Sequence, residues 1–167
     1  PYILSMSAFR GVDNIDPIAE GNSVNGSVPN NRRINAPAVT TLNANSYLLA
    51  AYAVDEANRD FTAPSGMDKR YNETQSATVG VLFTRDYNLS AMSSTEPFAA
   101  IGSTGNREAR VSSRGGSFVS HLVALNPDAV PPELDALVTN CSNLSTISLK
   151  FSKALNASTA ENINNYD

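Results

Sequence analysis

Short apolar runs separated by Gly, Pro, Asn, Asp and Ser recur along the chain, and this pattern predicts β-strands joined by turns. In the strongest run, Ser46–Val54, apolar side chains fill both alternating sets of positions, so we expect a central strand that is covered on both faces. Helical periodicity is nearly absent. Further strands are predicted at residues 2–9, 36–41, 67–71, 77–87, 107–112 and 117–125. Their spacing favours an all-β fold, an antiparallel β-sandwich.

Residues 11–35 form a long polar stretch between two predicted strands. The stretch contains Asn25-Gly26 and Asn30-Asn31, and these residue types favour turns. At about 25 residues it is longer than most connections between elements, so we expect either a functional loop or a small irregular strand within it.

A change of composition after residue 125 marks a domain boundary. Pro127, Pro131 and Pro132 lie close together there, and prolines exclude a central strand and favour an extended connector. We therefore expect three parts: a β-sandwich in residues 1–127, a proline-rich linker in residues 128–133, and the beginning of a second unit in residues 134–167.

The second unit carries two predicted strands, at residues 134–138 and 146–151. In the second of these, Ile147, Leu149 and Phe151 share one face. Because two strands seldom fold alone, we expect this unit to be cut off at residue 167.

The charge balance limits the partners of the protein. Its 167 residues carry a formal net charge of -4, and the isoelectric point is near 4.9. A mildly acidic surface repels phosphate backbones, so we expect no nucleic-acid partner. The longest apolar run, residues 47–54, is too short for a helix that crosses a bilayer, so we expect no membrane span.

The polar composition is typical of a secreted or cell-surface protein. Charged residues make up only 17% of the chain, and the single cysteine, Cys141, excludes an internal disulfide framework. The chain begins at Pro1, so we expect any signal peptide to be removed or to lie outside it. Asn-x-Ser/Thr triplets, which are glycosylation sites in eukaryotic secreted proteins, occur at Asn25, Asn72, Asn88, Asn140, Asn143 and Asn156.

Several motifs resemble a known module in their order and spacing. They are Ser-Ala-Phe-Arg-Gly-Val-Asp at 7–13, Ala-Pro-Ala-Val-Thr-Thr at 36–41, Pro-Ser-Gly-Met at 64–67, Gly-Ser-Thr-Gly at 102–105 and Phe-Val-Ser-His-Leu-Val-Ala-Leu at 118–125. Together they resemble the later half of a concanavalin-A-like jelly-roll module of large secreted bacterial proteins. The resemblance implies a jelly-roll-like sandwich that lacks its first strands, which another segment or subunit would supply.

The end of the chain resembles a second family. Leu-Lys-Phe-Ser-Lys-Ala-Leu at 149–155, Thr-Ala-Glu-Asn at 159–162 and Asn-Tyr at 165–166 resemble the opening of a bacterial immunoglobulin-like repeat. Such repeats imply a multidomain stalk at the cell surface that is usually non-catalytic. Neither resemblance supplies catalytic residues.

Candidates for catalysis are few, because catalysis needs complementary groups that converge on one point. His121 is the only histidine, and it shares an apolar face with Val119 and Val123, so we interpret it as a core or interface residue. A triad with Ser120 or Ser117 is open by spacing, but no local motif favours it. We therefore predict that the chain is not an enzyme and needs no cofactor.

Calcium binding is the one metal function that the loops suggest, because calcium prefers carboxylate and carbonyl oxygens. Loop Asp residues also make turns with their own backbone, and neither loop matches the twelve-residue calcium motif. The candidate ligands are Asp13 and Asp16 in one loop and Asp55 and Asp60 in another.

Sugar binding on a sandwich needs exposed aromatic rings with amides and carboxylates nearby. Tyr47, Tyr52, Phe83 and Phe118 fall within predicted strands, so we expect them in the core. The best predicted surface cluster consists of Tyr71 and Tyr87 with Arg70, Asn72 and Asp86.

Three functions remain open at this point. We favour a non-catalytic structural or adhesive module of a multidomain extracellular or cell-surface protein, whose partners are neighbouring domains or subunits. The second reading is a carbohydrate-binding module of a secreted polysaccharide-degrading enzyme, with a polysaccharide or cell-surface glycan as partner. The third is a filament subunit in which a neighbour adds a strand to an open sheet edge.

Overall fold

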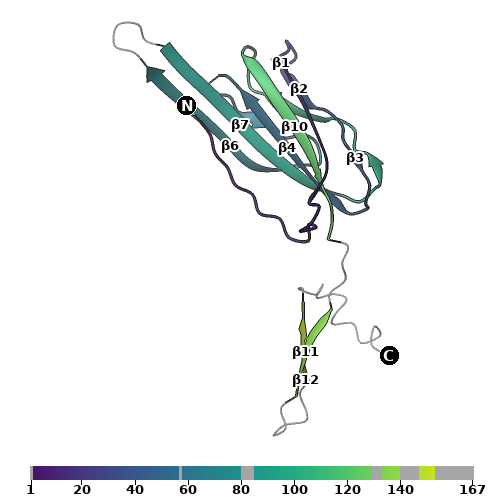
Figure 1. Cartoon of the computed structure of the whole chain (residues 1–167). Coiled ribbons are helices and arrows are strands. Elements are labelled where there is room, and N and C mark those ends of the chain that lie inside the picture. The colour runs from purple at the N-terminus through teal and green to yellow at the C-terminus, as the bar shows by residue number, and fades with distance from the viewer. Residues whose placement is uncertain (1, 57, 80–84, 129–132, 140–146, 153–167) are drawn as a thin grey trace. The chain divides into compact units, whose positions relative to one another are not determined.

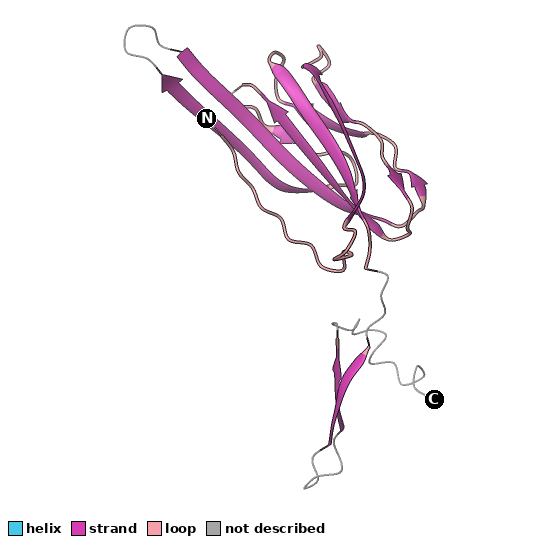
Figure 2. Cartoon of the chain, in the orientation of Figure 1, coloured by secondary structure: helices cyan, strands magenta, loops and turns pink. Residues whose placement is uncertain are grey.

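The protein is described by a computed structural model that covers residues 2–56, 58–79, 85–128, 133–139 and 147–152. Every regular element in these ranges is a β-strand, and all strand pairs are antiparallel. The prediction of an all-β antiparallel sandwich is confirmed (Figure 2). Within these ranges, no helix has the length and hydropathy for crossing a membrane. Contacts divide the chain into two units, Pro1–Asp128 and Ala129–Asp167.

A five-stranded sheet forms the larger layer of the first unit (Figure 1). In spatial order it consists of β1 (Ile18–Ser27), β10 (Ser117–Leu125), β4 (Ser46–Val54), β7 (Arg85–Phe98) and β6 (Asp68–Val79). The second layer contains a three-stranded sheet of β2 (Arg33–Ala36), β9 (Arg107–Val111) and β5 (Phe61–Thr62), and the pair β3 (Thr40–Thr41) and β8 (Gly102–Ser103).

The hydrophobic core lies between the two layers and explains the pattern of β4. Leu48, Ala50 and Tyr52 are buried and pack in one cluster with Ile34 and Val111 of the second layer. The alternating positions of β4, beginning at Tyr47, are half-buried on the opposite face. The predicted central strand is therefore confirmed, since β4 is the middle strand of its sheet.

A polar cluster joins the two layers at one end of the core. The Tyr52 hydroxyl donates to the Arg107 carbonyl oxygen at 2.7 Å. The Arg107 guanidinium donates from Nε to Oε1 of Glu96 at 2.6 Å, and its Nη2 lies 2.5 Å from the same oxygen. The side chains of Arg107 and Glu96 are only 14% and 13% exposed, so this ion pair links β9 to β7 largely away from water.

Because Tyr52 is buried, the stability of the fold depends on alkaline pH. Desolvation raises the pKa of its phenol above the ordinary value of 10.0; nearby Arg107 opposes this shift and Glu96 adds to it. A group whose folded pKa is raised contributes stability that is complete below its unfolded pKa and is lost as pH rises above that value. We expect the free energy of unfolding to fall as the pH rises above about 10, measured by urea denaturation. Tyr52→Phe should flatten this decline; an equally steep decline in that variant would contradict the assignment.

Two predicted boundaries in the first unit are wrong. Residues 2–9 are extended but form no strand, because they pair with no other segment. The strand predicted at residues 77–87 is divided between two elements, because residues 77–79 end β6 and residues 85–87 begin β7, which continues to Phe98. Ser90, Ser93 and Ser94 are buried in this part of β7, so small polar side chains take the place of the apolar ones that signal a strand.

The polar stretch at residues 11–35 contains all of β1 and the beginning of β2. Nearly all of β1 is exposed, because β1 is an edge strand that pairs with β10 on one side. The alternative of a strand within this stretch is therefore confirmed, although the strand is ten residues long and nearly regular.

The second unit contains an antiparallel pair, β11 (Leu134–Thr139) and β12 (Ile147–Phe151). Ser152 N donates to the Glu133 carbonyl oxygen at 2.9 Å and closes the open end of the pair. The motifs at 159–162 and 165–166, most of the predicted linker, Cys141 and the triplets at 140, 143 and 156 lie outside the described residues. The predicted immunoglobulin-like repeat therefore stays a prediction.

Candidate functional site

The candidate site is the face of the five-stranded sheet that points away from the core, which we name the outer face. Strand pairing aligns one residue from each strand into a row across this face. The row runs Ser23, His121, Ala51, Ser93 and Tyr71, from β1 to β6. Small side chains in the middle of the row, with larger ones on both sides, create a depression in the sheet surface.

This depression is a hollow of about 220 Å³. Its floor includes Ala51, Ala53 and Ala91, while Tyr71 and His121 stand on opposite sides. Leu89, Val119 and Ile3 complete its walls. The hollow therefore offers an apolar surface with one phenol and one imidazole at its rim, and we name it the histidine hollow.

The absence of a side chain at a glycine of the edge strand makes room for the imidazole of His121. Gly21 pairs with Val123, and a Cβ atom at Gly21 would lie 3.2 Å from Nε2 of His121. This distance is shorter than a comfortable carbon–nitrogen contact, so the ring lies over the bare backbone of β1. His121 is half-buried on the outer face. The sequence predicted a core or interface residue, but it did not show which face of the sheet the imidazole would occupy.

A β-bulge in β6 directs two consecutive side chains to the outer face. Lys69 pairs with Ser94 and Tyr71 pairs with Ser93, so Arg70 is the additional residue. Bulges re-aim side chains in this way. Tyr71 lines the histidine hollow, and Arg70 lines a second hollow on the same face.

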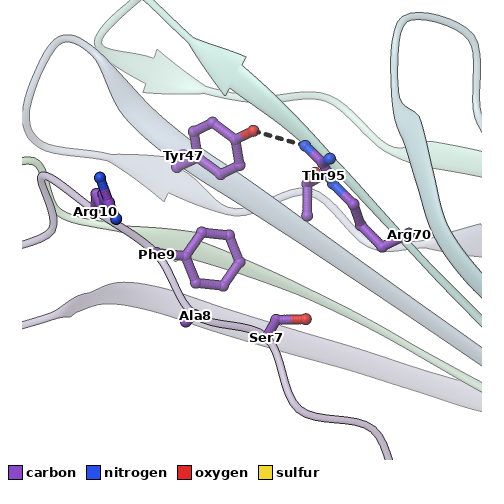
Figure 3. A pocket seen from close by; sticks show the side chains of 7 residues that line it. All are labelled: Ser7, Ala8, Phe9, Arg10, Tyr47, Arg70 and Thr95. Atoms are coloured by element: carbon purple, nitrogen blue, oxygen red, sulfur yellow. Dashed lines mark hydrogen bonds between the residues drawn. The ribbon is translucent and has the colours of Figure 1, made fainter.

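The second hollow has a volume of about 370 Å³ and is shown in Figure 3. Arg70 donates from Nε to Thr95 Oγ1 at 2.5 Å and from Nη2 to Tyr47 Oη at 3.1 Å. Phe9 packs its ring edge-on against Tyr47, with ring centroids 5.5 Å apart. We name it the arginine hollow. Tyr47, which we expected in the core, therefore lies on the outer face.

Residues 2–10, which we name the leading segment, form one wall of both hollows. Ile3 lines the histidine hollow, and Phe9 lines the arginine hollow. Three other apolar side chains of the segment point elsewhere: Tyr2, Leu4 and Met6 are 78%, 85% and 96% exposed. The segment thus presents two apolar residues to the outer face and three to solvent.

The chain is firmly anchored directly after the leading segment. Asp128 N donates to the Gly11 carbonyl oxygen at 2.8 Å, and Asp13 N donates to the Asn126 carbonyl oxygen at 3.0 Å. Val12 and Pro127 form an isolated β-bridge between these bonds. The motif that begins at residue 7 therefore ends in a fixed corner.

The predicted sugar-binding cluster is divided by the structure. Arg70 and Tyr71 both lie on the outer face, but the Asn72 side chain faces the 55–60 loop, where it donates to Asp60 at 2.6 Å and accepts from Phe61 N at 3.2 Å. Tyr87 pairs with Ala77, six residues beyond Tyr71 and therefore about 20 Å along β6. Asp86 pairs with Thr78, still farther along the strand.

Of the four candidate calcium ligands, Asp13, Asp55 and Asp60 use their carboxylates in contacts within the chain. The Asp13 carboxylate accepts from Ile15 N at 2.7 Å and from Asp16 N at 3.1 Å, which is an Asx turn. Asp55 accepts from Ser117 N, and Asp60 accepts from Asn72 and lies 3.7 Å from Lys69 Nζ. In the described part of the chain, no three Asp, Glu, His or Cys residues gather as a metal site would require. Calcium at these positions stays a prediction.

The serines beside His121 do not converge on it. Ser120 is buried on the core side of β10 and donates to the Asn35 carbonyl oxygen at 2.7 Å. Ser117 lies four residues along β10, about 13 Å away on an extended strand. The local geometry of β10 therefore provides neither serine as a nucleophile for His121.

The fold and the outer face place the first unit in the class of antiparallel β-sandwiches with an apolar, hollowed sheet surface. Comparisons of the chain with family models, with curated proteins and with solved structures found no match. The resemblance to a jelly-roll module and the expectation of missing first strands therefore stay predictions that rest on the motifs.

Proposed function

We propose that this chain is a non-catalytic structural or adhesive module of a multidomain extracellular or cell-surface protein, and that it binds its partner on the outer face. The histidine hollow carries the proposal. Its floor of alanines lies between Tyr71 and His121, and such a surface can seat an apolar side chain or a ring. The low charge of the sequence, its Asn-x-Ser/Thr triplets and the jelly-roll resemblance support the location.

An unsatisfied hydroxyl lies in the same row of the sheet. Ser93 belongs to the same row as His121 and Tyr71 and is 3% exposed. Its Oγ has no hydrogen-bond partner among the described residues. A buried polar group without a partner costs about 1–3 kcal/mol. Because Ser93 lines neither hollow, the packed sheet itself carries this cost.

Ala51→Arg tests the proposal, because it places a guanidinium on the floor of the histidine hollow without changing a core residue. Beads coated with the protein would be mixed with one another and with cellulose, chitin, xylan and mannan. We expect bead clumping or polysaccharide retention in the parent protein, and a loss of about tenfold or more in Ala51→Arg, because burying a charge in an apolar contact costs more than about 1.4 kcal/mol.

Ala99→Arg is the matched control, since Ala99 is exposed between strands and outside both hollows. It should bind like the parent protein. Circular dichroism would show that both variants keep the sheet. Binding that survives Ala51→Arg, or no binding at all in the parent protein, would refute the outer face as the binding surface.

Carbohydrate binding is the second candidate function, and the bulge in β6 favours it. The bulge brings the Tyr71 ring and the Arg70 guanidinium to one face, as stacking and hydroxyl recognition require. In this case Tyr71→Ala should abolish polysaccharide retention and Tyr71→Phe should keep it, because the ring remains. Bead clumping without polysaccharide retention would favour the structural role.

A further inference from the structure

We propose that the outer face binds the leading segment of a second copy of this chain, so that two copies exchange residues 2–10. This inference rests on the proposed function, because it names the partner of the outer face. It follows from how the leading segment is held, from where it is hinged and from what it leaves exposed.

The leading segment is held weakly in its own copy. Of the described residues, none from 2 to 10 donates or accepts a hydrogen bond, while the neighbouring strands of the sheet are joined along their whole pairing. Ile3 and Phe9 supply its apolar contacts with the outer face. Release of the segment therefore breaks side-chain packing and no hydrogen-bonded ladder.

Gly11 provides a hinge between this weakly held segment and the fixed corner. Its φ angle is +72°, and no atom lies within 4 Å of the position that a Cβ would take. A glycine in open space can change its backbone angles at little cost. The bonds at Gly11 O, Val12 and Asp13 keep the corner in place while the preceding residues swing away.

The exposed side of the leading segment favours a second copy as the partner. Tyr2, Leu4 and Met6 form an apolar stripe that the single copy leaves in water. Exchange between identical chains reproduces the Ile3 and Phe9 contacts of the single copy, so association needs no new complementary surface. The exchange also brings the outer faces of the two copies together. The apolar stripe of each copy can then be covered by the other copy.

Cysteine trapping tests the exchange directly. In a Cys141→Ser background, Phe9→Cys and Tyr47→Cys would be made as separate full-length variants with tags of different size. These two side chains face each other in Figure 3, so a disulfide between the two variants forms readily when the segment of one copy lies on the sheet of another. We expect a cross-linked heterodimer under mild oxidation of the mixed variants.

Ile15→Cys mixed with Tyr47→Cys is the control, because Ile15 is 94% exposed and lies in neither hollow. It should give little heterodimer. Circular dichroism of the reduced single variants would show that each one folds. Sedimentation of the unsubstituted chain should show a doubling of mass as concentration rises.

Three results would overturn the exchange. The first is a heterodimer yield no greater than that of the Ile15→Cys mixture, and the second is an unsubstituted chain that sediments as a monomer at every concentration. The third is a dimer that still forms when residues 2–10 are deleted, which would indicate strand addition at the exposed edge of β1. In each case, binding that is still lost in Ala51→Arg would leave the proposed function standing with a different partner.

Discussion

Arg107→Ala should lower the free energy of unfolding by about 3–5 kcal/mol, because it leaves the carboxylate of Glu96 buried without its partner. The Glu96 side chain is only 13% exposed, so its carboxylate has little contact with water. The same guanidinium donates from Nη1 to the carbonyl oxygens of Thr104 at 2.5 Å and Gly105 at 3.2 Å, and the turn after β8 loses these bonds as well. Urea denaturation followed by circular dichroism would measure the loss.

Arg33→Ala is the matched control for this prediction. Arg33 also pairs with a glutamate, Glu108, but these side chains are 53% and 40% exposed. An exposed pair contributes about 0–1 kcal/mol, so this variant should unfold almost like the parent protein. When Glu96→Gln is added to Arg107→Ala, the double variant should recover part of the lost stability, because an amide is less costly to bury than an unpaired carboxylate. Equal losses in the two arginine variants would show that burial of the Arg107 pair does not matter.

The second large effect is expected from two neighbouring leucines of β4 that face opposite ways. Leu48 is fully buried in the core, so Leu48→Ala should cost about 2–5 kcal/mol through lost packing and the cavity that remains. Leu49 is half-buried on the outer face. Leu49→Ala should cost roughly 1 kcal/mol, because only part of its area is withdrawn from water. Thermal and urea unfolding of both variants would measure the difference.

This pair also separates stability from binding. If the outer face is the binding surface, Leu49→Ala should weaken bead clumping or polysaccharide retention more than its small effect on unfolding explains. Leu48→Ala should change stability first and binding only through it. A larger loss of stability in Leu49→Ala than in Leu48→Ala would contradict the two-sided assignment of β4.

The sequence predicted the strands whose apolar pattern is strong. Ser46–Val54 and Ser117–Leu125 are β4 and β10 with the predicted limits. Both lie inside the sheet with partners on each side, so their side chains follow the alternation that burial imposes. The all-β class follows from such runs and from the turn residues between them.

The hydrophobic pattern did not identify the second half of β7 or the true nature of the leading segment. The second half of β7 carries buried serines, whose small side chains fit between closely packed layers but read as a loop in the sequence. The leading segment gives the opposite error, because its apolar residues suggest a strand although only Ile3 and Phe9 pack on the outer face and Tyr2, Leu4 and Met6 are exposed.

The predicted sugar cluster shows that residues adjacent in the sequence can face opposite sides of a sheet. Arg70 and Asn72 flank Tyr71, but the bulge keeps Arg70 on the outer face while Asn72 faces the 55–60 loop. A bulge is invisible in a single sequence, because it depends on the register with the partner strand. His121 escaped notice as a site residue for the same reason, since its alignment with Tyr71 depends on three strand pairings.

Gly21, on the edge strand β1, determines how much space the histidine hollow has at the centre of the sheet. The imidazole of His121 occupies the space that a side chain on β1 would fill, so one added methyl group would push the ring towards Ala51 and narrow the gap opposite Tyr71. Selectivity can thus be adjusted from an exposed position without disturbing the packed interior. If the histidine hollow is the binding site, natural variants that bind bulkier or slimmer partners are expected to differ first at this glycine.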